Sequence, residues 1–487
     1  MESSVAQVKV NFTTTHDDLQ LDESKRQLLV PAEIKRYGLS RILNSESMLN
    51  TSAPVPLDFL VNGTFLRTSL EEYIQSNGLS IESTITLQYV RSLLPPVYEA
   101  SFEHDDWISA VDVLSQTSRA GRWSGDAFHQ GKDRILSASY DGLVRVWDGS
   151  GQCLATAPSA SGGGHSKSVT DAKFLSSSQL ASVGLDQKVV VWKYAEPSDF
   201  SGTLKPTLEL HGHRKLINSL DVHGPSGRLL TASADGRVGL WSANKKSAPD
   251  VDADDIPATH ASSVKRAKLS NSSVTVPQRG ALAMISAHDG DLAAAAAAAT
   301  AATFHPTDAT VAYSASTDRT LRTLDLTTAR VVSTLTMLHP LLCLAPMRGA
   351  SSLVAAGSAA RHVTLLDPRA SAQATSVLTL RGHGNMISAL APSPDNEYSL
   401  ASASHDGAVK IWDLRSVRPA TKDEGGGGVC EAVYSIGREW LRGKKAPVGG
   451  EGVKVFGLAW DQTWGIVSGG EDKKLQINRG RDLFASS

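Results

Sequence analysis

The sequence predicts a mainly β protein, in which seven four-stranded β-sheets, the blades of a closed propeller, follow a small α+β domain. A twelve-residue pattern occurs seven times between Ser137 and the end of the chain. Each copy reads as two strands joined by a tight turn, as expected for blades stacked around a ring. The 487 residues exceed one propeller by about a hundred, enough for a small second domain.

The seven copies share one design. Most have a small polar residue, an Asp four positions later and an apolar residue six positions beyond the Asp. In the first copy, Asp141 and Gly142 supply the backbone freedom of a hairpin turn, and alternating apolar residues indicate strands on both sides. A blade buries its faces only against neighbours, so seven blades close a ring without a long exposed edge. The copies are SASYDGLVRVWD (Ser137), SVGLDQKVVVWK (Ser182), TASADGRVGLWS (Thr231), SASTDRTLRTLD (Ser314), AGSAARHVTLLD (Ala356), SASHDGAVKIWD (Ser402) and SGGEDKKLQINR (Ser468).

In four repeats an upstream His completes a set of His, Ser or Thr, Asp and Trp, which we call the polar tetrad. We predict that the His ring bridges the Asp to the hydroxyl group and the Trp N–H, so that all four polar groups are satisfied. Ser, His and Asp also make hydrolytic triads, but a trio repeated at equivalent positions indicates a scaffold and not an enzyme. The tetrads are His104, Ser137, Asp141 and Trp147; His165, Ser182, Asp186 and Trp192; His213, Thr231, Asp235 and Trp241; and His383, Ser402, Asp406 and Trp412.

The other three repeats have lost members of the tetrad. We interpret the losses as missing internal cross-links, with altered rims of the propeller as the alternative. The seventh copy ends only a few residues before the last residue, so we expect residues 97–102 to supply its outer strand and close the ring. The replacements are Leu324 in blade four; Ala356, Ala360 and Leu366 in blade five; and Glu451 for His and Asn478 for Trp in blade seven.

Composition excludes several classes of function. Forty-eight basic and 50 acidic residues give a net charge of −2, so bulk charge does not require nucleic acid or a membrane. Three widely spaced cysteines argue against a disulfide framework or a cysteine-rich metal site. The sequence predicts no signal peptide, no membrane-spanning segment, no nucleotide loop and no small-molecule substrate.

Residues 1–92 are predicted to form the second domain, with the propeller at 93–487. Their order of strand, strand, helix, hairpin, helix and strand is that of a ubiquitin-like β-grasp. No C-terminal Gly-Gly tail follows, so a modifier role is not expected. The predicted elements are a strand at 7–12, a second strand ending at 28–30, a helix from Pro31 to about Leu43, a hairpin at 56–66 turning at Asn62 and Gly63, a helix at 69–79 and a strand at 84–90.

A polar stretch at residues 243–280 is predicted to be a flexible loop between blades three and four. It holds a short basic cluster, Lys265, Arg266 and Lys268, after an acidic patch. Such a cluster indicates a nuclear-import signal or a contact to RNA phosphates, and a solvated charge run is the remaining alternative.

The two predicted domains together resemble one family. The repeats resemble the WD-repeat family. A ubiquitin-like segment running through NGLSIEST and ITLQYVRSLLPPVYEASF into a propeller resembles the NLE domain shared by Notchless and the YTM-type family, also called WD repeat-containing protein 12. The connector at residues 90–113, and seven repeats instead of the eight of Notchless, are closer to the YTM type. The resemblance covers nearly the whole chain.

This resemblance implies a non-catalytic assembly factor for the large (60S) ribosomal subunit of eukaryotes, acting in rRNA processing. The propeller would bind the block-of-proliferation propeller protein, and through it Pescadillo, in the PeBoW complex on pre-60S particles. The NLE domain would dock on the metal-ion-dependent adhesion site of midasin, an AAA-type ATPase that pulls the factor off. The implied location is the nucleus, in nucleolus and nucleoplasm.

Glu82 is the candidate contact to midasin. It lies in the loop SIEST before the last strand of the domain and matches the acidic residue of the NLE motif. Mg²⁺ prefers carboxylate oxygens, so Glu82 would complete the partner's Mg²⁺ site; no metal or cofactor of the chain's own is expected. The alternative is an ordinary solvated glutamate, which is how we interpret Glu71 and Glu72.

A second class of function stays open on the propeller alone. It is a generic WD-repeat adaptor, such as a ubiquitin-ligase substrate receptor or a Notchless-like factor. Direct contact with RNA is also left open. Co-migration with 60S precursors would favour the assembly factor over the adaptor.

Overall fold

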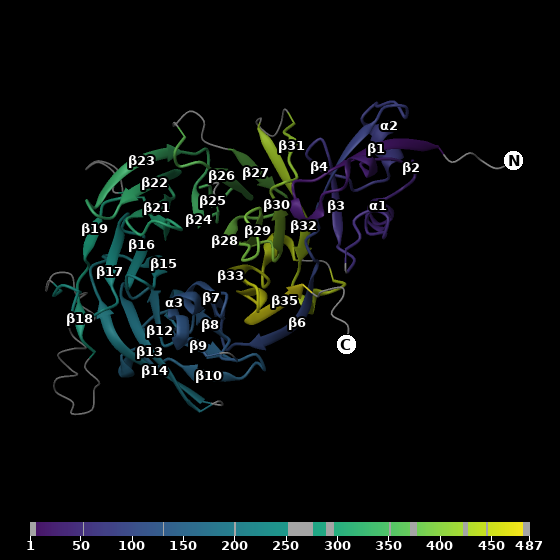
Figure 1. The fold of residues 1–487 in the computed structure, drawn as a ribbon. Coiled ribbons are helices and arrows are strands. Elements are labelled where there is room, and N and C mark those ends of the chain that lie inside the picture. Colours follow the sequence, from purple (N-terminus) through teal and green to yellow (C-terminus); the bar gives the residue numbers. More distant parts are fainter. Residues whose placement is uncertain are drawn as a thin grey trace, which may run out of the picture. The chain divides into compact units, whose positions relative to one another are not determined.

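The structure, a computed structural model, describes residues 6–51, 53–129, 131–198, 201–251, 276–288, 297–349, 352–370, 377–421, 427–444 and 447–480. The chain divides into two compact units (Figure 1). The first contains residues 1–95 with 414–430, and the second contains residues 96–413 with 431–481. Among the described residues, no helix combines the length and the apolar character that a bilayer crossing requires.

The first unit is built on a five-stranded sheet in the order β2-β1-β5-β3-β4. The two strands at its centre, β1 and β5, run parallel, while the remaining neighbours are antiparallel. Parallel central strands flanked by two hairpins are the arrangement of a β-grasp. The strands are β1 (Gln7–Thr13), β2 (Gln27–Pro31), β3 (Leu57–Val61), β4 (Thr64–Phe65) and β5 (Ile85–Arg91).

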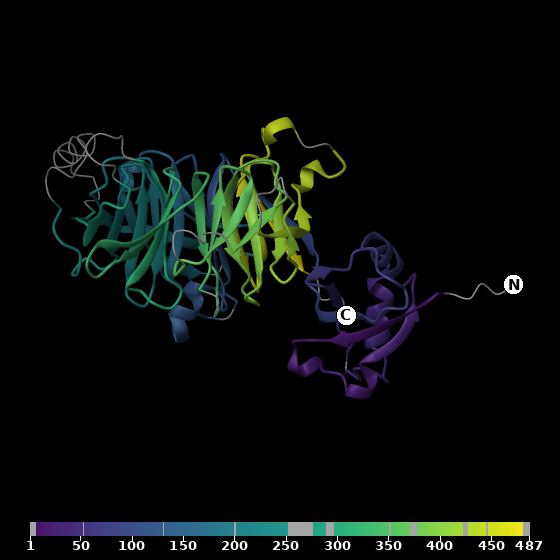
Figure 2. The same ribbon diagram turned by 90° about the horizontal axis from the view of Figure 1, so that it is seen from above.

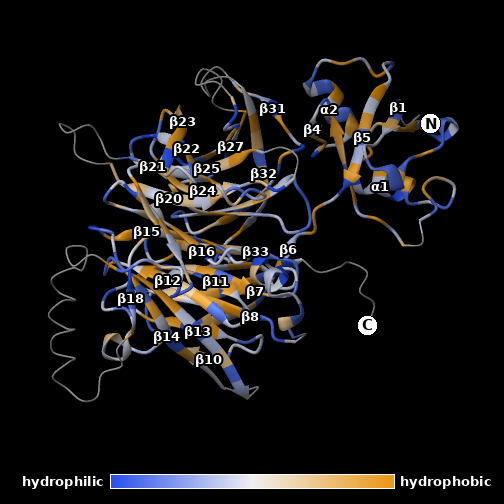
Figure 3. Ribbon diagram, turned by 60° about the vertical axis from the view of Figure 1, so that its left-hand side comes forward, coloured by the Kyte–Doolittle hydropathy of each residue, from blue (hydrophilic) through white to orange (hydrophobic). Residues whose placement is uncertain are grey.

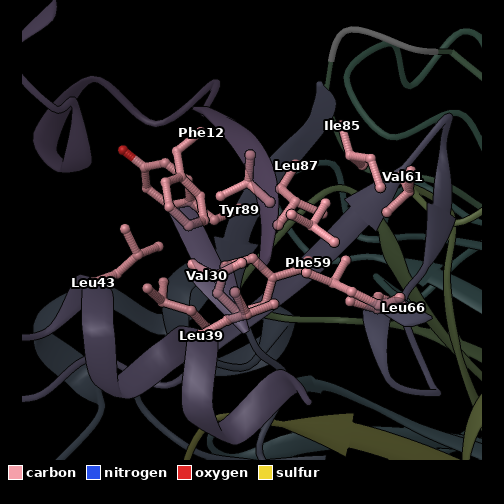
Figure 4. Close-up of a cluster of buried hydrophobic side chains, with 14 of the residues drawn as sticks. Phe12, Val30, Leu39, Leu43, Phe59, Val61, Leu66, Ile85, Leu87 and Tyr89 are labelled. Carbon is pink, nitrogen blue, oxygen red and sulfur yellow. The ribbon is translucent and has the colours of Figure 1, made fainter. Parts of the chain in front are cut away.

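Two helices, α1 (Arg36–Leu43) and α2 (Leu70–Ser76), complete this unit. Leu39 and Leu43 of α1 face the buried side chains of the sheet, including Phe12 and Tyr89 (Figure 4). Ser69 caps α2 by accepting from the Glu72 amide, and the Glu72 carboxylate accepts from the Ser69 amide. This capping box starts the helix where the sequence predicts it.

The predicted start of α1 at Pro31 is wrong. Pro31 is the last residue of β2 and pairs with Gln7, and α1 begins only at Arg36 after an extended Lys35. Proline has no N–H to donate, so it can end an edge strand as readily as open a helix. Edge pairing to β1 decides the outcome here.

The described part of the second unit forms seven blades (Figures 1 and 2). Blades one to three hold β7 (Ile108–Leu114), β8 (Arg134–Ser139), β9 (Val144–Trp147) and β10 (Cys153–Thr156); β11 (Val169–Ser176), β12 (Gln179–Gly184), β13 (Val189–Ser198) and β14 (Ser201–Leu210); and β15 (Ile217–His223), β16 (Arg228–Ser233), β17 (Val238–Ser242) and β19 (Ala283–Ile285).

The remaining blades follow in chain order. Blades five and six are joined by hydrogen bonds between β27 and β32. Blades four to seven hold β20 (Ala299–Phe304), β21 (Val311–Ser316), β22 (Thr320–Asp325) and β23 (Arg330–Thr336); β24 (Leu341–Pro346), β25 (Val354–Ser358), β26 (His362–Leu366) and β27 (Leu378–Arg381); β28 (Ile387–Pro392), β29 (Ser399–Ser404), β30 (Val409–Asp413) and β32 (Gly428–Ile436), with β31 (Arg418–Pro419) beside it; and β33 (Val455–Asp461), β34 (Gly465–Gly470) and β35 (Lys474–Gly480).

The ring is closed by a strand from the other end of the domain, as the sequence predicts. β6 (Pro96–Glu103) pairs antiparallel with β35 and becomes the outer strand of blade seven. Phe102 of β6 is buried beside Trp147 of blade one, with ring centroids 5.9 Å apart. Apolar residues follow the strands, and hydrophilic residues dominate the connections (Figure 3).

The polar stretch 243–280 leaves the propeller within blade three and not between blades three and four as predicted. It connects β17 with β19, the third and fourth strands of that blade. Its returning end forms β18 (Gln278–Arg279), which adds to the edge of blade two beside β14. The Gly280 amide donates to the carbonyl of Pro249 over 2.9 Å, so the described ends of this insertion meet. The basic cluster Lys265, Arg266 and Lys268 lies outside the described residues.

Candidate functional site

Glu82 lies in a short loop, residues 78–84, between α2 and β5, which we call the Glu82 loop. Gly78 ends α2 with a φ of 62°, a conformation that favours glycine. The Leu79 amide then donates to the carbonyl of Ile74 over 3.0 Å. The hydroxyl and amide of Ser83 both donate to the Ser80 carbonyl, over 2.6 and 3.1 Å. Hydrogen bonds within the loop therefore fix its backbone.

The Glu82 side chain is exposed, and no described residue forms an ion pair or hydrogen bond with its carboxylate. The two nearby glutamates differ from it. Glu72 belongs to the capping box of α2, and Glu71 accepts a hydrogen bond from Gln75 over 3.3 Å. Of the three acidic side chains, Glu82 is the one free to bind a cation outside this chain.

Three of the four predicted polar tetrads are formed. In blade two, His165 Nδ1 lies 3.0 Å from Asp186 and Nε2 lies 2.7 Å from the Ser182 hydroxyl. Trp192 Nε1 donates to the same hydroxyl over 2.7 Å. The tetrads of His213 in blade three and His383 in blade six repeat this geometry within 0.2 Å of these distances. Each network ties the turn of the Asp to the interior of its blade.

The predicted tetrad of blade one is incomplete. Trp147 Nε1 donates to Ser137 over 2.8 Å, but both ring nitrogens of His104 lack a hydrogen-bond partner among the described residues. Arg145, four residues after Asp141, takes its carboxylate at 2.7 Å. Burial and the neighbouring charge of Arg145 lower the pKa of His104 to about 4, so the ring is neutral at pH 7. The arginine has displaced the histidine as partner of the Asp.

We expect the propeller to lose stability as the pH falls from about 5 to 2. Burial alone raises the pKa of Asp186, but the charge and hydrogen bond of His165 outweigh it and lower the pKa to about 2, and His213 does the same for Asp235. Because these pKa values lie below the ordinary 3.8, each ionised carboxylate adds about 2 kcal/mol to the free energy of unfolding above pH 4. This contribution is lost as the pH falls through 2. The unfolding temperature measured as a function of pH tests this expectation. It would be contradicted if the unfolding temperature of an Asp186→Asn variant fell as steeply below pH 4 as that of the wild type.

Blade seven contains a substitute that the sequence did not reveal. We expected Glu451 in place of the His, but Arg438 occupies that role. Its guanidinium contacts Asp472 at 2.7 and 2.9 Å and donates to the Ser468 hydroxyl over 2.9 Å. Arg438 lies 30 positions before Ser468, against 17 to 19 for the His in the three complete tetrads. The presence of a basic residue before the last blade could have indicated this substitute. Residues 439–454, inserted between Arg438 and the first strand of the blade, moved it away from the position where the other repeats have their His.

Blade four keeps part of the polar network, whereas blade five has lost it. In blade four, His288 bridges Asp318 and Ser314 at 2.9 Å each, and the buried Leu324 replaces the Trp as predicted. In blade five, Ala356 and Leu366 are buried and bring no polar group to the interior. Among the described residues, no group of three or more His, Cys, Asp or Glu is placed to hold a metal ion.

Comparison with known sequences agrees with this architecture. The NLE (NUC135) domain matches residues 8–74, within the first unit. The WD domain, G-beta repeat, matches residues 97–148, 151–193, 204–242 and 374–413. The matched repeats correspond to blades one, two, three and six, which are the blades with a Trp in the tetrad position.

Whole-chain relatives decide the family. The chain is 63% identical to the ribosome biogenesis protein YTM1 of Chaetomium globosum, over 100% of this chain and 99% of that protein. The chain belongs to the YTM1 family of ribosome biogenesis proteins. It is also 62% identical to the Neurospora crassa protein of that name, over 99% of both chains, and 50% identical to that of Aspergillus fumigatus, over 99% of this chain and 96% of the relative. Membership in the YTM1 family assigns this WD-repeat protein a role in ribosome biogenesis.

Proposed function

We propose that this protein is a non-catalytic assembly factor of the large ribosomal subunit. Its propeller holds the block-of-proliferation propeller protein and, through it, Pescadillo on pre-60S particles in the nucleolus and nucleoplasm. Its NLE domain docks on the metal-ion-dependent adhesion site of midasin, which then uses ATP to remove the factor. Identity to YTM1 proteins over the whole chain supports the ribosomal part of this proposal.

The observation that carries the midasin contact is the free carboxylate of Glu82. A Mg²⁺ ion held by a partner needs an oxygen ligand from outside to complete its octahedral coordination. Glu82 offers that oxygen from a loop whose backbone is fixed by Ser80 and Ser83. A ligand on a fixed loop loses little conformational freedom when it binds. The metal stays with the partner, and this chain contributes one ligand.

The apolar neighbours of Glu82 support the same contact. Leu79 and Ile81, which precede Glu82 in the same loop, are 41% and 42% exposed. Apolar side chains beside a charged ligand add contact area that excludes water from the ion pair. A carboxylate in the same loop as two exposed apolar residues therefore fits a protein surface better than free solvent.

The ribosomal part is tested by sedimentation of the tagged protein from cell extracts on a sucrose gradient. We expect it to co-migrate with 60S precursors, together with its two partner subunits, at physiological salt. Migration only as a small complex, away from all precursors, would contradict the assembly role and favour a generic adaptor.

A further inference from the structure

The centre of the propeller encloses a cavity of about 730 Å³, and one of its ends is lined by arginines. The innermost strands of the seven blades form its wall. α3 (Arg119–Ser124), a helix in the connection between β7 and β8, lies near the centre of the ring (Figure 1). Arg119 and Arg122 of α3 line the cavity together with Arg348, which follows β24.

Specific contacts hold α3 in this position. The guanidinium of Arg119 donates to the Asp221 carboxylate over 2.9 Å and to the Val222 carbonyl over 2.7 Å, and it lies 5.0 Å from the Trp123 ring. A Cβ on Gly224 would approach that ring to 2.5 Å, so only glycine leaves room for Trp123 at this point. The helix is therefore fixed to blade three, and the position of Arg122 with it.

Two of the arginines, Arg122 and Arg348, form no direct ion pair with a described residue. The closest polar contact of Arg348 is the Pro394 carbonyl at 3.5 Å. Burial lowers the pKa of Arg348, and the charges of Arg122 and Arg119 lower it further. The carboxylates of Asp461 and Asp395 have a smaller opposing effect. At Arg348 the repulsion from the other two arginines thus exceeds the attraction of the nearby carboxylates.

We propose that Arg122 and Arg348 bind a carboxylate side chain of an acidic segment from a partner polypeptide, which enters this end of the cavity. Guanidinium groups pair with carboxylates through two parallel N–H donors, and the pairing strengthens where water is excluded. The two groups come from different blades, so one carboxylate between them could accept hydrogen bonds from both and offset one of the two positive charges. This site is separate from Glu82, and its failure would leave the midasin contact untouched.

The surrounding charges favour a short acidic peptide over RNA. A nucleic acid backbone needs a track of basic side chains along its path. Here the connections between inner and second strands also hold acidic residues: Asp308 between β20 and β21, and Asp395, whose charge acts on Arg348, between β28 and β29. Asp171 and Asp221 also line the cavity. Lys173, the other cation of the lining, is near Asp171 and Asp221 and so does not extend the arginines into a basic track, which suits a single carboxylate.

The test uses the full chain and two labelled probes, octaglutamate and an oligouridylate, in fluorescence anisotropy at low ionic strength. We expect the Arg122→Gln/Arg348→Gln double variant to bind octaglutamate about tenfold more weakly than wild type. Arg330→Gln removes an exposed arginine outside the cavity and should bind like wild type. Thermal unfolding of both variants shows that the fold is kept.

Three results would overturn the proposal. They are equal octaglutamate affinity of wild type and the double variant, no octaglutamate binding by wild type, and oligouridylate binding with the same dependence on Arg122 and Arg348. The last result would assign the site to RNA instead.

Discussion

Replacing Glu82 by alanine is expected to weaken Mg²⁺-dependent binding to the adhesion-site domain of midasin about 100-fold, which corresponds to about 3 kcal/mol. The substitution removes the only oxygen that the proposal brings to the partner's metal. Glu82→Asp should weaken binding almost as much, because the shorter side chain withdraws the carboxylate and the hydrogen-bonded loop cannot follow. Pull-down or calorimetry with purified domains, with and without EDTA, measures both effects.

A matched control is available in the same unit. Glu46 is an exposed loop glutamate, and no described residue pairs with its side chain. Glu46→Ala should bind midasin like wild type. All three variants should still join the PeBoW subunits, and Glu82→Ala should accumulate on pre-60S particles because release is blocked. Unchanged midasin affinity of Glu82→Ala would remove the assignment.

Local patterns predicted most of the fold. The seven hairpins could be read from the turn residues and the alternating apolar residues of each copy, because both signals lie within about twelve positions. The donated outer strand β6 could be inferred because the seventh blade would otherwise lack a strand. The position of Glu82 depended on the resemblance, since a loop glutamate has no pattern of its own.

Competition between distant side chains could not be predicted in the same way. His104 looks like any other tetrad histidine until Arg145, at the start of β9, takes the carboxylate of Asp141 in the preceding turn. β18 belongs to the insertion of blade three, but it pairs with β14 at the edge of blade two. In both cases the local sequence allows two outcomes, and contacts formed in the folded protein select one.

Replacing Arg438 by methionine is expected to lower the free energy of unfolding of the propeller by about 3–5 kcal/mol. The side chains of Arg438 and Asp472 are only 2% and 3% exposed, so the variant leaves a buried carboxylate whose remaining donors are the Trp440 ring at 3.0 Å and the Lys474 amide at 3.2 Å. Removing one partner of such a pair costs far more than removing both, because the cost comes from the uncompensated charge. Urea denaturation followed by tryptophan fluorescence measures the change.

An exposed ion pair on the same segment provides a control for the loss of a buried one. Arg442 pairs with Glu439 at 3.1 Å, but its side chain is 82% exposed, so Arg442→Met should change stability by less than about 1 kcal/mol. Adding Asp472→Leu to Arg438→Met should recover part of the loss, since no buried charge then remains unpaired. If Arg438→Met cost no more than Arg442→Met, the arginine would not be the element that replaces the histidine in stabilising blade seven.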